Sequence, residues 1–275
     1  MEIPVLCYHA HILPSSDYAD NGHRALASDL ELIQASGRRI VPLDRVVDWV
    51  AGERGDEEMA GAVALSFDDG TRLDFEATDH PELGPLPGFL PLLEEFAARC
   101  PATQPTVHAT CFVIASPRAR EQADCELLFG LDWLDSGWWR AAENSGRIAI
   151  ENHSWDHNMA VAEEAPLAER DRFDNVETFE HAEHEIARAQ EFLAAELGRR
   201  PRLFGYPYGQ SNEYLTAEYL PKRGAELGLR AAFSTAGRAV RRDDSCWNLP
   251  RYVHGHHWRD PAGLAEILEV HGARA

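Results

Sequence analysis

The stretch Ala62-Val63-Ala64-Leu65-Ser66-Phe67-Asp68-Asp69-Gly70 joins a nearly continuous apolar run to two adjacent carboxylates and a glycine. Such a run is typical of a strand that is covered on both faces, as strands of parallel sheets are. Successive strand residues point to opposite faces, so Asp68 and Asp69 can share one site only where the strand ends and the chain turns. Gly70 supplies the conformational freedom for that turn.

Strand-like and helix-like stretches alternate on both sides of this run. Expected strands cover 3–8, 39–43, 62–67, 108–114, 147–150, 203–206, 231–235 and 249–253, and expected helices cover 28–37, 43–51, 89–100, 132–145, 176–197 and 213–228. Repeated strand–helix units predict a parallel α/β fold. No composition shift or repeat divides the 275 residues, so we expect a single domain over residues 1–275. A stretch near 71–88, rich in Pro, Gly and Asp, looks like a loop inserted over one end of the fold.

Composition narrows the classes of partner. The chain is 44% hydrophobic and 26% charged, as in an ordinary globular protein, and its formal net charge is -20. That charge repels phosphates and anionic lipid surfaces, which argues against nucleic-acid and membrane partners. It leaves neutral and amino-sugar substrates open.

The five cysteines and the start of the chain bear on the compartment. The cysteine number is odd, the spacing is wide and no CxxC pair occurs, which favours reduced thiols in a cytoplasmic protein. The start, Met1-Glu2-Ile3-Pro4, lacks a basic region and a long apolar segment, so we expect no signal peptide.

A second polar patch, Glu151-Asn152-His153-Ser154-Trp155-Asp156-His157, follows another expected strand and carries two histidines four positions apart. On a helical turn such residues lie on the same side. Polar clusters at strand exits converge on one face of a parallel α/β fold. Asp69, His153 and His157 would then form a three-ligand metal site with an open position for water or substrate.

These ligand types favour Zn²⁺, with Co²⁺ or Ni²⁺ as alternatives. A bound zinc ion lowers the pKa of its water to about 7 and polarises a carbonyl group. Asp68 is then placed to accept the proton of the attacking water. The pattern therefore indicates a metal-assisted hydrolase.

The sequence resembles a known family at three motifs, Ser66-Phe67-Asp68-Asp69-Gly70, His153-Ser154-Trp155-Asp156-His157 and Phe204-Gly205-Tyr206-Pro207-Tyr208-Gly209. They are similar to the first three motifs of the polysaccharide deacetylase, or NodB-homology, family, also called carbohydrate esterase family four. The resemblance implies a distorted (β/α) barrel of about seven parallel strands, a divalent metal and hydrolysis of N-acetyl groups on amino sugars. It makes Asp68 the catalytic base, Asp69, His153 and His157 the metal ligands, and the backbone amide of Tyr208 a partner of the oxyanion.

One departure from the family pattern concerns the arginine that steadies the base. Many members carry it two residues before the proline of the third motif, where this chain has Gly205. We expect Arg251, in Leu249-Pro250-Arg251, to take its place.

A second departure concerns the general acid, because the late Leu-x-His motif has no clear counterpart. The start Ile3-Pro4-Val5-Leu6-Cys7-Tyr8-His9 resembles the opening of the poly-N-acetylglucosamine deacetylase branch, in which the motif order is permuted and a Tyr-His pair near the N-terminus supplies the acid. His9 is therefore the expected acid, since histidine titrates near neutrality. The rivals are His254, His256 and His257.

The expected substrate is a small molecule or an oligosaccharide, contacted by Pro207, Tyr208 and Trp247. Removal of an acyl group, most simply N-acetyl, from an amino sugar or related amide is the first hypothesis. A ring-opening hydrolase of cyclic imides or ureides, with residues 71–88 as a lid over a closed pocket, is the second. A non-catalytic carbohydrate-binding relative is the third, and the absent motif-three arginine is its only support. The oligomeric state is left open.

Overall fold

One parallel sheet organises the structure, a computed structural model that describes residues 1–159 and 171–270. Seven strands follow the order β10-β9-β8-β7-β4-β2-β12, and β3 pairs with β4 beside this path. Their bounds are β2 (Val5–Tyr8), β3 (Arg39–Ile40), β4 (Ala62–Phe67), β7 (Ala109–Val113), β8 (Ile148–Asn152), β9 (Leu203–Gly205), β10 (Ala231–Phe233) and β12 (Tyr252–Val253). Every pairing in this sheet is parallel, as the apolar strand runs predicted.

The sheet curls into a distorted barrel because a short C-terminal segment links its two edges. Leu249 forms a parallel bridge with Phe233 of β10, and a few residues later β12 pairs with β2. Pro250 and Arg251 lie between these two contacts. The predicted distorted (β/α) barrel is confirmed.

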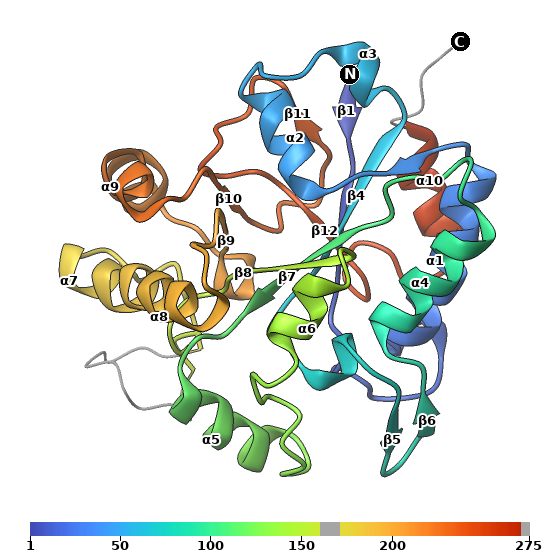
Figure 1. Ribbon diagram of the computed structural model, residues 1–275. Coiled ribbons are helices and arrows are strands. Elements are labelled where there is room, and N and C mark those ends of the chain that lie inside the picture. The colour runs from blue at the N-terminus through green and yellow to red at the C-terminus, as the bar shows by residue number, and fades with distance from the viewer. Residues whose placement is uncertain (160–170, 271–275) are drawn as a thin grey trace.

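Helices surround the sheet (Figure 1). Their bounds are α1 (Gly22–Ala35), α2 (Leu43–Val50), α3 (Asp56–Met59), α4 (Phe89–Arg99), α5 (Pro117–Leu127), α6 (Trp139–Asn144), α7 (Phe179–Ala182), α8 (Arg188–Leu197), α9 (Leu220–Leu227) and α10 (Pro261–Val270). The π-helical stretches η3 (Glu183–Ala187) and η5 (Tyr214–Tyr219) lead into α8 and α9, and short 3-10 turns are η1 (Tyr18–Asp20), η2 (Arg72–Asp74) and η4 (Pro207–Gly209). Helices α1, α4 and α10 pack together on one side of the sheet.

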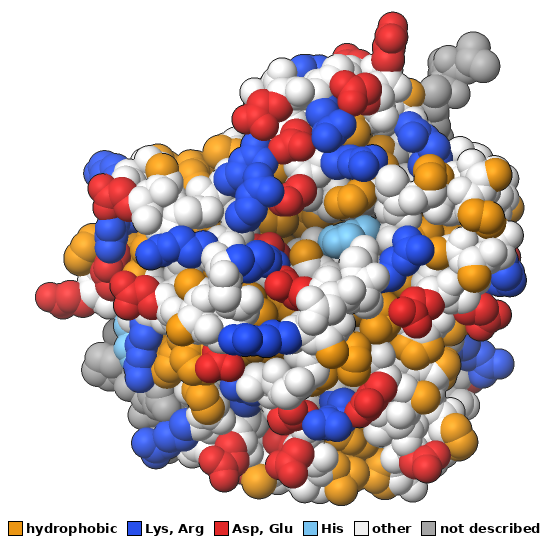
Figure 2. Space-filling model, viewed as in Figure 1, with side chains coloured by type: hydrophobic (Ala, Val, Ile, Leu, Met, Phe, Trp, Pro, Cys, Tyr) orange, Lys and Arg blue, Asp and Glu red, His pale blue; other side chains and the backbone are white. Residues whose placement is uncertain are grey.

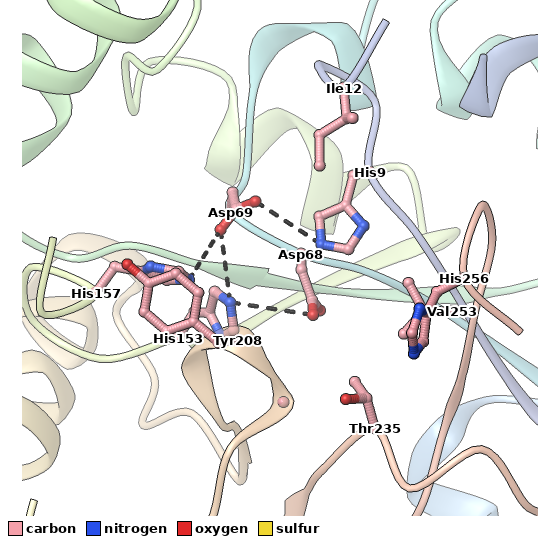
Figure 3. A pocket seen from close by; sticks show the side chains of 11 residues that line it. His9, Ile12, Asp68, Asp69, His153, His157, Tyr208, Thr235, Val253 and His256 are labelled. Carbon is pink, nitrogen blue, oxygen red and sulfur yellow. Dashed lines mark ion pairs between the residues drawn. The ribbon is translucent and has the colours of Figure 1, made fainter. Parts of the chain in front are cut away.

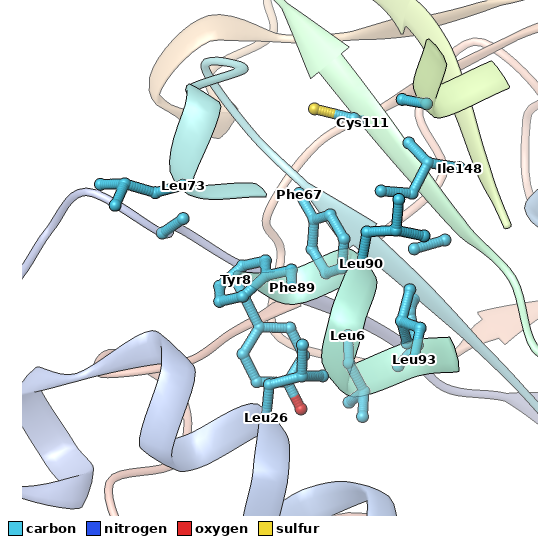
Figure 4. Packing of buried hydrophobic residues seen from close by; sticks show 14 of the residues in the cluster. Leu6, Tyr8, Leu26, Phe67, Leu73, Phe89, Leu90, Leu93, Cys111 and Ile148 are labelled. Carbon is cyan, nitrogen blue, oxygen red and sulfur yellow. The ribbon is translucent and has the colours of Figure 1, made fainter. Parts of the chain in front are cut away.

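The largest apolar cluster fills the space between the sheet and helices α1 and α4 (Figure 4). Leu6 and Phe67 contribute from the strands, and Leu26, Phe89 and Leu93 from the helices. Each fully buried side chain of this size contributes roughly 1.5–3 kcal/mol. This packing holds β2 and β4 side by side, so that their carboxyl ends meet at the same edge.

Helix α1 begins earlier than the predicted range 28–37. Asn21 caps it, since its side-chain oxygen accepts a hydrogen bond from the backbone N–H of Arg24 at 3.0 Å. Asparagine is among the strongest N-cap residues. Ser28, the cap expected from the sequence, therefore lies inside the helix.

The predicted helix over 132–145 is confined to α6. Its first half is a loop, because the buried carboxylate of Asp124 accepts the backbone N–H groups of Asp132 at 3.0 Å and Trp133 at 2.9 Å. Helices α5 and α10 had no counterpart in the predicted elements. The stretch near 71–88 contains η2 and the antiparallel pair β5 (Thr78–His80) and β6 (Gly84–Leu86).

Acidic and basic side chains are interspersed on the face that Figure 2 shows. Ion pairs on the protein include Arg202–Asp44 at 2.9 Å and Arg230–Asp48 at 2.7 Å. At the N-terminus, β1 (Glu2–Ile3) pairs with β11 (Val240–Arg241), apart from the main sheet. All five cysteines are free thiols. Within the described ranges, no helix combines the length and apolar character needed to cross a membrane.

Candidate active site

The turn after β4 brings both aspartates to one site. Asp69 adopts φ 72° and Gly70 adopts φ 77°, so the chain leaves the strand through two left-handed residues. A Cβ atom at Gly70 would overlap the side chain of Val113, which explains the need for glycine. The next turn is held by Asp74, whose carboxylate accepts the backbone N–H of Thr71 at 2.6 Å. A non-glycine residue at positive φ costs energy that the surrounding packing must offset.

The two histidines follow β8 in a loop, and the predicted helical turn is wrong. Ser154 and His157 have φ values of 72° and 61°, which no right-handed helix contains. Side chains bond back to the backbone instead: Asn152 Oδ1 accepts from Ser154 N at 2.8 Å, and Ser154 Oγ accepts from His157 N at 2.9 Å. This local network brings the rings of His153 and His157 to a centroid distance of 4.9 Å.

Asp69, His153 and His157 converge on one point (Figure 3), and their ligand atoms all lie within 4.8 Å of one another. Asp69 Oδ1 is 3.6 Å from His153 Nε2 and 3.3 Å from His157 Nε2. Nitrogen and oxygen ligands of tetrahedral zinc, bound at about 2.0–2.2 Å, lie about 3.3–3.6 Å apart. The donor set and its spacing therefore fit a zinc-like ion.

The two imidazoles are prepared to act as ligands. His153 Nδ1 donates to the carbonyl of Gly205 at 2.8 Å, which leaves the Nε2 lone pair directed toward Asp69. Burial lowers the pKa of His157 to about 3, so its ring is neutral at physiological pH. A histidine side chain binds a metal ion in its neutral form.

Asp68 is held by Arg251 in a buried, two-pronged ion pair. Arg251 Nη1 donates to Asp68 Oδ1 at 2.6 Å, and Nη2 donates to Oδ2 at 2.8 Å. Arg251 is 0% exposed and Asp68 is 3% exposed. Burial, the largest single influence, would raise the pKa of Asp68, but the charge and hydrogen bonds of Arg251 together with the nearby imidazoles of His153 and His9 lower that pKa, so the carboxylate stays ionised. Ser66 Oγ lies 3.2 Å from Arg251 Nη1 and helps to position it.

There is no space at position 205 for the arginine that many members of the family described above carry in the third motif. A Cβ atom there would lie 2.8 Å from Cγ of Phe112 and 3.1 Å from Nδ1 of His153. The chain thus places its guanidinium from the barrel-closing segment, as expected for Arg251.

His9 stands at the exit of β2 and faces Asp69, with His9 Nε2 3.9 Å from Asp69 Oδ2 (Figure 3). A second histidine beside Asp69 was not predicted from the sequence. His11 Nε2 lies 3.6 Å from the same Asp69 oxygen, and burial lowers its pKa. The spacing His9-Ala10-His11 directly after a strand was the available signal.

The rival histidines differ in placement. His256 lines the same cavity as His9 and Asp68. His254 stacks on Tyr8 at 5.8 Å between ring centroids, and burial lowers its pKa to about 4. His257 Nδ1 accepts the backbone N–H of Val253 at 2.8 Å. Of the three, His256 is therefore the alternative candidate for the general acid, because it alone lines this cavity.

The expected substrate contacts separate into two groups. Tyr208, with φ 56°, lines the cavity, and its ring lies 4.4 Å from that of His157. Pro207 is buried and opens the turn that presents Tyr208. Trp247 does not line the cavity: its indole packs where a Cβ of Gly224 would be, and its carbonyl accepts the Tyr206 hydroxyl at 2.8 Å. The expected substrate contact of Trp247 is therefore replaced by a packing role.

The reaction cavity has a volume of about 400 Å³ and contains Asp68, Asp69, His153 and His157. A second cavity of about 360 Å³ shares His9, Ile12, Val253 and His256 with it. The two adjoin along these residues. No residue of the predicted lid, 71–88, is among the described residues that line either cavity. The lid expectation is therefore wrong: this stretch forms η2 and the β5–β6 hairpin, and it packs Leu73 and Leu86 into the main apolar cluster.

Comparison with known proteins agrees with this architecture. The deacetylase PplD of Streptococcus pyogenes, in complex with acetate, superposes with a TM-score of 0.65 at 16% identity, covering 98% of this chain and 98% of that chain. IcaB from Ammonifex degensii gives 0.65 at 21% identity, covering 99% and 97%. A de-N-acetylase from Aggregatibacter actinomycetemcomitans gives 0.62 at 16% identity, covering 97% and 100%. A comparison with curated proteins finds no match.

These identities establish a shared fold. The family itself is shown by sequence, because the profile of the polysaccharide deacetylase family matches residues 56–231, more than half of the chain. The matched range contains Asp68, Asp69, His153, His157 and Tyr208 but ends before Arg251. This protein is therefore a member of the polysaccharide deacetylase family of hydrolases.

Proposed function

We propose that the protein is a metal-dependent hydrolase that removes an N-acyl group from an amino sugar or a related amide. Asp69, His153 and His157 would hold the metal, with Zn²⁺ the expected ion and Co²⁺ or Ni²⁺ as alternatives. Such an ion supplies a water of lowered pKa and polarises the amide carbonyl.

The chain's own residues account for the proton movements. Asp68, kept ionised by Arg251, accepts a proton from the attacking water. His9, which lines the same cavity, donates a proton to the leaving amine. The turn at Tyr208 borders the same space and is suited to orient the carbonyl oxygen.

A single observation carries this proposal. A carboxylate locked by a buried arginine stands directly beside an open carboxylate–imidazole ligand set. A sugar-binding relative without activity has no need of an ionised base in that position. The absence of an arginine in the third motif was the only support for such a relative. Because Arg251 pairs with Asp68 instead, that support is lost.

An oligosaccharide fits the site better than a small cyclic imide. The reaction cavity continues into the adjoining cavity of about 360 Å³, whereas a ring-opening enzyme was expected to have a closed pocket under a lid. The second wall includes Asp20 and Arg259, which offer polar contacts to a neighbouring sugar.

The test measures amine release from N-acetylglucosamine oligomers by zinc-loaded and chelated protein. Zinc-loaded protein should be active, and chelation should abolish turnover until zinc is restored. Asp68→Asn should lower kcat by about 10²–10⁴-fold while zinc content stays near that of the parent. Asp79→Asn, an exposed change on β5, is the matched control. Full activity of Asp68→Asn would reject Asp68 as the base.

A further inference from the structure

A third cavity, of about 280 Å³, borders Asp69 and His157 of the ligand set. It shares Asp69, His157 and Tyr208 with the reaction cavity, while Asp68 and His9 are not among the described residues that line it. We call it the acyl cavity. Its remaining walls are largely apolar and consist of His11, Ile114, Ala123, Leu127, Leu128, Leu134, Met159 and Asp171.

The position of the acyl cavity suits one part of the substrate. A scissile amide has its amine on one side of the carbonyl carbon and its acyl substituent on the other. The proposed acid, His9, lies in the reaction cavity, so the amine and its sugar belong there. The acyl substituent then points across Asp69 and His157, toward the acyl cavity.

The size and lining of the acyl cavity exceed what an acetyl group needs. An apolar cavity of about 150 Å³ is enough to bind benzene. A methyl group would leave most of the space beside Ile114, Leu134 and Met159 without apolar contact. A sugar is a poor occupant, because away from Asp69, His157 and Tyr208 at the border with the reaction cavity, His11 and Asp171 are the polar side chains among the described lining residues.

We propose that the acyl cavity binds the alkyl part of an N-acyl group longer than acetyl, and that the preferred substrates are amino sugars that carry such a chain. This inference rests on the proposed function. In the reaction, water supplies the oxygen of the new C–O bond and the C–N bond breaks. One proton of the water ends on the amine, and the other is released as the new carboxylic acid ionises. The products are a carboxylate of several carbons and a free amino sugar.

The first test is a chain-length series. N-acetyl-, N-butyryl-, N-hexanoyl- and N-octanoylglucosamine are assayed with zinc-loaded protein by amine release. Burial of one methylene is worth a factor of about four when complete, so kcat/KM should rise about two- to fourfold per methylene up to the length that the cavity holds. A flat or falling series with good acetyl turnover overturns the inference and leaves the proposed function standing.

Variants at the wall connect the preference to the acyl cavity. Ala123→Phe, on α5, fills the cavity and should bring the ratio of hexanoyl to acetyl kcat/KM close to one. Leu127→Ser at the exposed rim should lower the same ratio with little risk to folding, since Leu127 is 61% exposed. Glu121→Phe, on the exposed surface of α5, is the matched control and should keep the parent ratio. An unchanged ratio in both wall variants overturns the inference.

A binding measurement covers the case of slow turnover. Acetate, butyrate and hexanoate, as product analogues, are titrated into zinc-loaded protein by calorimetry. Hexanoate should bind at least tenfold more tightly than acetate, and Ala123→Phe should erase the difference. Equal affinities refute the acyl cavity. Failure of every substrate to be hydrolysed, with the carboxylate preference present, would instead refute the proposed function.

Discussion

Replacement of Arg251 by methionine separates its charge from its volume. In the parent protein the guanidinium holds the pKa of Asp68 below its ordinary value of 3.8. Methionine fills similar space without charge, so Asp68 remains buried and loses its partner. Burial, the largest influence on this carboxyl, then raises its pKa. We expect a base that is protonated over part of the physiological range.

Two magnitudes follow. Breaking one side of a buried ion pair costs about 3–5 kcal/mol of unfolding free energy at neutral pH. The folded pKa of Asp68 in the variant lies above its unfolded value, so this penalty is present at high pH and fades as the pH falls through the raised pKa. In the parent the folded pKa is depressed, so the stabilising contribution of Asp68 holds above the unfolded pKa and is lost only in strong acid.

The assay is kcat/KM against pH, with zinc saturating, for the parent and Arg251→Met. The variant should gain an acid limb along which activity falls about tenfold per pH unit. Urea unfolding of Arg251→Met, Asp68→Asn and the double variant completes a cycle, in which the double variant should be less destabilised than the sum of the single changes. A parent-like pH profile in Arg251→Met, or strict additivity in the cycle, would refute the reasoning.

Three further predictions use other parts of the site and the core. His9→Gln should slow hydrolysis of amides with poor amine leaving groups about 10²-fold or more and activated amides much less, and the same selective loss in His256→Gln would transfer the acid role. Adding Gly205→Arg to Arg251→Met should not rescue kcat, because there is no space for a Cβ at that position; recovery of activity would contradict this geometry. His23 is buried with a folded pKa of about 4 against an ordinary 6.5, so its contribution to the unfolding free energy should decline as the pH falls from 6.5 toward 4, by up to about 1.4 kcal/mol per unit. Urea unfolding at pH 7 and pH 5 should accordingly show the stability gap between the parent and His23→Gln shrinking, and a constant gap would count against it.

Local pattern was enough to predict the kind of fold and the core of the site. Apolar runs ending in polar clusters indicate parallel strands, and the carboxyl ends of such strands lie at one edge whatever the details of packing. Asp68, Asp69 and His153 come directly after strands, and Tyr208 lies in the short turn that follows β9, so their meeting was predictable. Helix boundaries were less so, because a cap such as Asn21 or a buried carboxylate such as Asp124 overrides propensity.

Contacts between residues far apart in the chain required the folded structure. The Arg251–Asp68 pair spans 183 positions and exists because residues 249–253 bridge the two edges of the sheet. Three other features also depend on how separate elements pack. They are the proximity of His11 to Asp69, the packing of Trp247 against Gly224 outside the reaction cavity, and the apolar cavity beside α5. Periodicity reports which face of an element is buried but carries no information on which distant side chain it will meet, since that is set by the closure and packing of the whole barrel.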